Sequence, residues 1–306
     1  MSAHVPAPLQ TIRVESMEEA DLAAIADRVD ARADMVLGIG GGTAIDTAKY
    51  ISWARGIPAV YLPTIASVDA TFTDAVGVRR DRKVVYVGQV RPLEVVIDLP
   101  MIASAPARLN RAGIGDILSC HTGLFDWRVA TEHGQGVPWN DELADLGKEL
   151  LVELEQAAPA IRAASSEGIS FLIDAYRRIG AACAAGGHSR FEEGTEHFLG
   201  YALEEDTGMH FVHGELISMC VAAMSTIQGN DPDRAIRIIL SAGTLAHPDA
   251  VGLSREVVVR NLVRLADYVQ AEELDFSTVN LGAVTPEQAE AAWDVVSRLP
   301  GEGSER

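Results

Sequence analysis

The sequence predicts an α/β amino-terminal domain with a short parallel sheet, followed by an all-helical domain. Before Pro106, short apolar runs alternate with helical patterns, as in a doubly wound parallel sheet. Beyond Pro106 the strand patterns disappear, and amphipathic helical patterns such as 141–158 and 256–272 follow. We therefore expect two domains, over residues 1–105 and 106–306.

Sequence patterns predict the elements of the first domain in turn. Ser16 followed by Glu19 matches a capping box, which predicts that a helix begins there. Apolar runs predict strands, and a charged turn at 79–82 between two such runs predicts a hairpin. The expected order is a strand at 11–14, a helix after Ser16, a strand at 35–39, a helix at 44–54, a strand at 57–62, a hairpin over 76–87 and a strand at 95–98.

Composition limits the classes of protein to consider. A chain of 306 residues with 48% hydrophobic content can bury the cores of two domains. Its formal charge of -19 argues against nucleic acid or an anionic membrane as a partner. Three separated cysteines without a C-x-x-C pair favour a reducing cytoplasm, and no apolar run approaches the roughly 20 residues that span a bilayer. We expect a cytoplasmic protein without membrane insertion.

Three consecutive glycines follow the predicted strand at 35–39. Gly40, Gly41 and Gly42 allow a sharp turn and a close approach of the backbone to a ligand. Thr43 is the expected N-cap of the next helix, whose free N–H groups would bind an anion such as a pyrophosphate. The run is equally compatible with a tight turn that binds nothing, and it lacks the spaced G-x-G-x-x-G fingerprint.

Two groups of motifs stand out along the chain. The first comprises GIGGGT at 38–43, DTAK at 46–49, LPTIASVDA at 62–70, VVID at 95–98, APARL at 105–109 and AGIGD at 112–116. The second comprises DW at 126–127, SR at 189–190, GTEH at 194–197 and HGE at 213–215. The first group closely resembles glycerol dehydrogenases, and the second is more similar to sn-glycerol-1-phosphate dehydrogenases. Both belong to one superfamily, which also contains iron-containing alcohol dehydrogenases and dehydroquinate synthases. The resemblance implies a dehydroquinate synthase-like fold with a Rossmann-like sheet.

The resemblance implies that Asp116, His197 and His213 hold a divalent metal ion. Taken singly, each has an ordinary alternative, as a helix cap, a core or solvated histidine, and a helix-start residue. Two neutral imidazoles and one carboxylate leave the ion with residual positive charge and an open position. An alcohol oxygen bound there loses its proton more easily, and hydride can then leave for a nicotinamide ring. Zn²⁺ is expected over Fe²⁺, since no redox step at the metal is needed.

Further site residues follow from the same resemblance. Asp69 is expected to accept a hydrogen bond from a substrate hydroxyl and to relay its proton, although a turn aspartate is the alternative. Arg190 could hold a substrate phosphate bidentately. The residues expected to bind NAD or NADP are Gly40, Gly41, Gly42, Thr43, Asp46, Thr64 and Ser67.

The chain departs from the family pattern in two places. Relatives carry many more residues before the glycine turn, including a first strand and helix that help to hold adenosine. The sheet is therefore expected to be shortened, with an edge that a second copy of the chain could cover. Tyr201 stands where the phosphate-using relatives have a second histidine, which indicates a changed substrate pocket.

These observations favour a metal-dependent, NAD(P)-linked dehydrogenase acting on a small polyol or its phosphate, with residues 1–105 binding the nucleotide and residues 106–306 the metal and substrate. Two alternatives stay open. One is a non-redox lyase or cyclase on a sugar phosphate, related to dehydroquinate synthase. The other is a relative that keeps the fold and metal but has no turnover.

Overall fold

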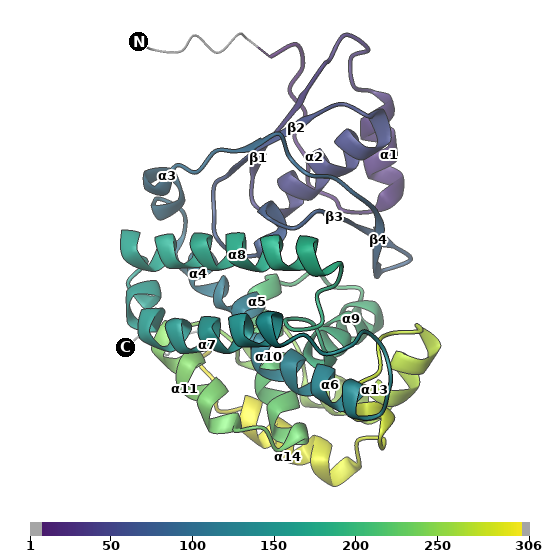
Figure 1. Cartoon of the computed structure of the whole chain (residues 1–306), viewed down its shortest axis with the longest axis vertical. Coiled ribbons are helices and arrows are strands. Elements are labelled where there is room, and N and C mark those ends of the chain that lie inside the picture. Colours follow the sequence, from purple (N-terminus) through teal and green to yellow (C-terminus); the bar gives the residue numbers. More distant parts are fainter. Residues whose placement is uncertain (1–7, 302–306) are drawn as a thin grey trace. The chain divides into compact units, whose positions relative to one another are not determined.

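The computed structural model describes residues 8–301 and divides into two compact units. The sheet unit comprises Met1–Thr64 and Asp74–Asp98, and the helical unit comprises Ile65–Thr73 and Leu99–Arg306. The predicted fold class, a short parallel sheet followed by helices, is confirmed (Figure 1). Because residues 65–73 belong to the helical unit, the chain passes between the units three times.

The sheet unit contains a three-stranded parallel sheet and a separate hairpin. The sheet has the order β1-β2-β5, and β3 pairs with β4 in antiparallel register. Asp81 and Arg82 adopt φ values of 53° and 68°, which a type I′ hairpin turn requires. The elements are α1 Glu19–Asp27, β1 Val36–Gly40, α2 Gly42–Arg55, β2 Ala59–Pro63, β3 Ala75–Arg80, β4 Lys83–Gln89 and β5 Glu94–Val95.

Helix α2 packs directly on β1 because small residues face each other there. A Cβ on Gly38 would lie 2.7 Å from the Cβ of Ala48. Ile45 on the same helix is fully buried with Ala59 and Tyr61 of β2. The predicted strand–turn–helix–strand around the glycine run is therefore confirmed.

The predicted strand at 11–14 is wrong. Residues 11–14 form no regular secondary structure. Pairing with β3 begins only a few residues further along the sequence. Met17 accepts a hydrogen bond from Arg79 N at 2.7 Å, and Glu18 forms an isolated bridge with Arg79. A distant partner strand therefore determines where this segment pairs.

The predicted capping box at Ser16 is also wrong. Helix α1 begins at Glu19 with Glu18 as its N-cap residue. The Ser16 hydroxyl accepts a hydrogen bond from Glu18 N at 3.1 Å, and the Glu19 carboxylate is bound by Arg80. Both side chains have thus found other partners.

The helical unit is built around α10, which is buried on all sides. This helix is buried from Gly214 to Ser225 and contacts α5, α9 and α14 (Figure 1). Helices α7 and α13 confirm the patterns at 141–158 and 256–272. Within residues 8–301, no helix has the length and apolar character needed to cross a bilayer. The elements are η1 Asp69–Thr71, α3 Leu99–Ala103, α4 Ala107–Ala112, α5 Ile114–Leu118, α6 Cys120–Glu132, α7 Asp141–Arg162, α8 Ser166–Gly186, α9 Thr195–Thr207, α10 His213–Gln228, α11 Pro232–Ala242, α12 Pro248–Val251, α13 Arg255–Ala271, η2 Thr278–Asn280 and α14 Pro286–Val296.

Candidate metal centre

Three helices of the helical unit bring Asp116, His197 and His213 together. Asp116 lies on α5, His197 in the first turn of α9, and His213 at the first position of α10. One carboxylate oxygen and one nitrogen of each imidazole all lie within 4.8 Å of one another. This is the donor set that the sequence analysis predicted.

Two glycines let α5 and α10 approach closely enough to place these ligands. A Cβ on Gly115 would lie 2.5 Å from Gly214 Cα, and a Cβ on Gly214 would overlap the carbonyl oxygen of Ala112. Asp116 follows Gly115 directly and His213 precedes Gly214 directly. Backbone contact between the two helices therefore fixes the separation of the two side chains.

The Asp116 carboxylate is buried and only partly hydrogen-bonded. Its Oδ2 accepts from Asp69 N at 2.9 Å, whereas its Oδ1 accepts no hydrogen bond and lies 3.1 Å from His213 Nε2. Burial raises the pKa of Asp116, but the positive charges of His213 and His197 outweigh burial and lower the pKa. A buried carboxylate oxygen without a donor, facing imidazole nitrogens, fits a divalent cation.

His197 is oriented by the residue that precedes it. Its Nδ1 lies 3.0 Å from Glu196 Oε1, and that oxygen also accepts from Gly194 N at 2.7 Å. This contact leaves Nε2 as the nitrogen available to an ion. Burial lowers the pKa of His197, but the hydrogen bond and charge of Glu196 raise it to about 9. A cation therefore competes with a proton at this imidazole.

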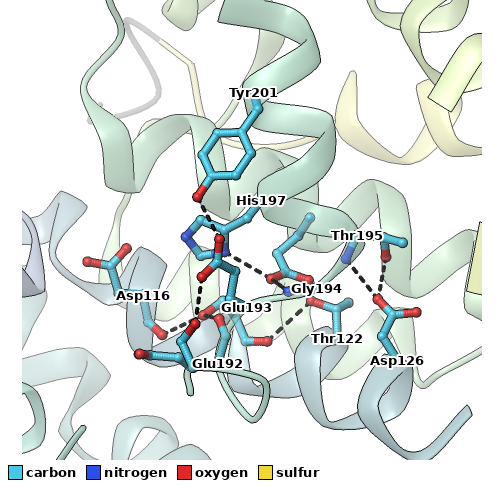
Figure 2. Close-up of polar contacts among 12 residues, drawn as sticks. Asp116, Thr122, Asp126, Glu192, Glu193, Gly194, Thr195, His197 and Tyr201 are labelled. Atoms are coloured by element: carbon cyan, nitrogen blue, oxygen red, sulfur yellow. Dashed lines mark hydrogen bonds and ion pairs between the residues drawn. The ribbon is translucent and has the colours of Figure 1, made fainter. Parts of the chain in front are cut away.

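Acidic side chains that the sequence did not predict lie beside Asp116 and His197 (Figure 2). Glu193 accepts hydrogen bonds from the hydroxyls of Ser189 and Tyr201, each at 2.7 Å. Glu192 is buried and accepts from the Cys183 thiol at 2.9 Å. Burial raises the pKa of Glu192 well above its ordinary value, and the charge of Asp69 raises it further. The local signal for these residues was the pair Glu192-Glu193, which precedes Gly194 in the motif that contains His197.

Asp126 fixes the start of α9 from a distance. Its Oδ2 accepts from Thr195 N and Oγ1 at 2.8 and 2.7 Å, and its Oδ1 accepts from Thr278 N and Oγ1 at 2.8 and 2.6 Å. One buried carboxylate on α6 thereby joins the first residue of α9 to η2. His197 lies two residues further along α9, so its position depends on this junction.

The expected cofactor residues at the glycine turn lie together in the sheet unit. Thr64 N donates to Gly40 O at 2.9 Å, which places the end of β2 beside the turn. Helix α2 begins at Gly42 with Gly41 as its N-cap residue, and no side chain caps it. The expectation that Thr43 is the N-cap is wrong, because Thr43 lies inside the first turn.

Two other expected cofactor residues lie in different units. Asp46 forms an ion pair with the buried Lys49, 3.3 Å away, and Lys49 donates to Ala75 O at 3.0 Å. Ser67 belongs to the helical unit, where its carbonyl oxygen would lie 3.3 Å from a Cβ on Gly214. Ser67 is thus close to the start of α10.

Arg190 has a structural environment that differs from the expected phosphate site. Its guanidinium is 3–4% exposed and donates to Glu193 O at 3.1 Å and to Phe276 O at 2.8 Å. Asp275 lies 3.8 Å from its Nε. The two hydrogen bonds use two of the five guanidinium N–H donors, and the binding of a substrate phosphate by Arg190 stays a prediction.

Comparisons with known proteins agree with the fold. The family model for iron-containing alcohol dehydrogenases matches residues 4–106. An NAD(P)+ glycerol-1-phosphate dehydrogenase of Methanosphaerula palustris is 32% identical over 90% of this chain and 74% of that protein. The corresponding enzyme of Aeropyrum pernix is 28% identical over 92% of this chain and 79% of that protein. The crystal structure of a probable glycerol dehydrogenase from Sinorhizobium meliloti 1021 superposes with a TM-score of 0.69 at 22% identity, covering 92% of this chain and 82% of that one.

Proposed function

Because this chain belongs to the iron-containing alcohol dehydrogenase superfamily, in its glycerol and glycerol-1-phosphate dehydrogenase branch, we propose that it is a metal-dependent, NAD(P)-linked oxidoreductase. It interconverts an alcohol and a carbonyl on a small polyol or polyol phosphate. The observation that carries this proposal is the convergence of Asp116, His197 and His213, with a buried Asp116 oxygen that accepts no hydrogen bond.

Asp116 Oδ1 and one nitrogen of each imidazole would hold the ion. When bound, a divalent ion supplies a Lewis acid that polarises the oxygen of the alcohol or carbonyl. We favour Zn²⁺ over Fe²⁺, because a nitrogen and oxygen donor set that undergoes no redox step suits zinc. Glu196 keeps His197 in one orientation, which preserves the donor set between turnovers.

Asp69 is the residue to which we assign the substrate proton. Its main-chain N–H donates to Asp116 Oδ2, so the start of η1 is tied to a proposed ligand. Its carboxylate would accept a hydrogen bond from a substrate hydroxyl and take up the proton during alcohol oxidation. In the reverse direction the same carboxyl group would return the proton.

We assign cofactor binding to the glycine turn and the strand end beside it. Helix α2 has no side-chain cap, so its first N–H groups can bind a pyrophosphate. When bound, NAD or NADP would supply the hydride acceptor for the alcohol and the hydride donor for the carbonyl. The proposed residues are Gly40, Gly41, Gly42, Thr43, Asp46, Thr64 and Ser67.

We further propose that the protein acts in the cytoplasm as a homo-oligomer without a nucleic-acid partner. The formal charge of -19 supports the last point. Leu37 and Ile39 on β1 are 46% and 55% exposed, and a second copy of the chain would cover such apolar side chains. Size measurement in solution at several concentrations tests this expectation.

Metal content tests the ligand assignment. The wild-type protein is expected to bind one equivalent of Zn²⁺, whereas Asp116→Asn and His213→Ala weaken binding by more than about 100-fold. His133→Ala is the matched control, because this exposed histidine on the same unit hydrogen-bonds to Val129 O and stacks on Phe276. Full occupancy in both ligand variants would refute the assignment.

Cofactor binding and turnover test the reaction class. NADH and NADPH are titrated against the zinc-loaded protein by fluorescence, followed by absorbance assays with glycerol, dihydroxyacetone and their phosphates. We expect binding of at least one nucleotide and turnover of at least one pair. A chain that binds neither nucleotide is not an NAD(P)-linked oxidoreductase.

A further inference from the structure

A negative charge is held beside the proposed metal centre by two hydroxyl groups. The Glu193 carboxylate accepts from Tyr201 through Oε1 and from Ser189 through Oε2. Figure 2 shows this carboxylate next to the His197 imidazole, below the Tyr201 ring. The side chain is half-buried, so a small molecule at the centre could meet it.

The arginine nearest to Glu193 in sequence has a buried side chain that binds main-chain oxygens. Arg190 directs Nη1 to the main-chain oxygen of Glu193 and Nη2 to that of Phe276, and its side chain is 4% exposed. It therefore binds backbone oxygens, while the Glu193 carboxylate keeps hydroxyl partners. Asp69 and Glu192 add further carboxyl groups close to Asp116.

We propose that Glu193 is a specificity-determining residue that makes this site select an uncharged polyol over its phosphate monoester. The proposal rests on the oxidoreductase function given above and narrows its substrate class. A polyol hydroxyl can donate a hydrogen bond to a carboxylate, and this hydrogen bond strengthens the binding of the polyol. The phosphate group of a monoester adds acceptor oxygens and about −1.5 to −2 charge near pH 7, and the same carboxylate repels that charge.

The first test compares kcat/KM for glycerol and for sn-glycerol 1-phosphate in the zinc-loaded full chain. Wild type is expected to prefer glycerol by at least about tenfold, and Glu193→Gln to reduce that ratio by about tenfold. Glu193→Asp keeps the charge and should keep a preference for glycerol. Glu290→Gln is the matched control, because this carboxylate lies on α14 and pairs with Arg255.

The second test measures binding without turnover. Inorganic phosphate is titrated calorimetrically into the zinc-loaded wild type, Glu193→Gln and Tyr201→Phe, after their melting curves confirm folding. We expect phosphate to bind Glu193→Gln about tenfold more tightly than wild type. Equal phosphate affinities, or a wild-type preference for the phosphate ester that Glu193→Gln leaves unchanged, would overturn the proposal. Failure to turn over either compound would instead contradict the oxidoreductase function, and the phosphate titration would still decide the role of Glu193.

Discussion

The helical unit and the sheet unit bury their apolar residues to different extents. Helix α10 is buried along most of its length, from Gly214 to Ser225. On β1, by contrast, the alternating side chains Leu37 and Ile39 are 46% and 55% exposed, so one face of that strand is open. The candidate metal centre therefore rests on a closed core, whereas the glycine turn ends a strand that is only half covered. We accordingly expect substitutions in the closed core to disturb the geometry of the metal ligands. Substitutions on the exposed face of β1 should have little effect.

Disrupting the contacts of α10 with α4 and α5 should have the largest effect. In Gly214→Ala the new Cβ overlaps Ala112 O, and because both groups belong to packed helices neither can move freely. We expect a loss of about 3–5 kcal/mol in the free energy of unfolding, measured with urea, together with loss of Zn²⁺ binding. The matched control is Gly282→Ala, where a Cβ meets nothing within 4 Å and stability should hardly change. Equal stability of both variants would contradict this account of the contacts.

Removal of the Asp126 carboxylate should have the next largest effect. Asp126→Ala leaves the N–H and hydroxyl groups of Thr195 and Thr278 without their acceptor. We expect the unfolding free energy to fall by about 2–3 kcal/mol and Zn²⁺ affinity to fall about tenfold, since α9 carries His197. Asp294→Ala, at an exposed position on α14, is the control and should change neither quantity. Unchanged zinc affinity in Asp126→Ala would show that the junction made by Asp126 does not affect metal binding.

Helices with a clear periodicity of apolar residues could be predicted from the sequence, whereas the positions of helix caps could not. The patterns at 141–158 and 256–272 predicted α7 and α13, because burial of one helix face decides such segments. The cap at Ser16 failed because Glu19 pairs instead with Arg80, which is 61 residues away. A short-range motif cannot anticipate a partner at that distance.

In the candidate site, too, some features could be predicted from the sequence and others could not. Family motifs indicated Asp116, His197 and His213, which the structure brings together although they lie far apart in the sequence. The role of Asp126 could not be predicted, because its partner Thr278 is 152 residues away. The environment of Arg190 was likewise unpredictable, because it depends on a main-chain oxygen at Phe276. Residue type indicates possible chemistry, while the fold decides which groups are already engaged.

The pH dependence of stability offers a smaller test of the closed core. Burial lowers the pKa of His121, with a further contribution from Arg234, although Asn230 O and Asp231 oppose the shift. The folded pKa therefore lies below the unfolded value of about 6.5, so below that pH the unfolded chain binds the proton first. Stability from this group is complete above pH 6.5 and is lost as the pH falls toward the folded pKa. His121→Gln keeps a donor for Asn230 O but does not titrate.

Urea unfolding at pH 7.5 and at pH 5.5 measures this contribution. The wild type should lose more stability between the two pH values than His121→Gln does. The other acidic and histidine side chains are common to both proteins, so their titration cancels in the comparison. Identical pH dependence in the two proteins would show that His121 is equally protonated in the folded and unfolded chains.

The smallest effect is expected on the open face of β1. Ile39→Thr keeps a β-branched side chain at a position that is 55% exposed, so the unfolding free energy should change by no more than about 0.5 kcal/mol. Ile45→Thr makes the same change at a fully buried position in the same unit and should cost about 2 kcal/mol. Both are measured by urea unfolding at low protein concentration. If Ile39→Thr proved as costly as Ile45→Thr, the face of β1 would be covered in solution, and a dependence of that cost on protein concentration would identify a second copy of the chain as the cover.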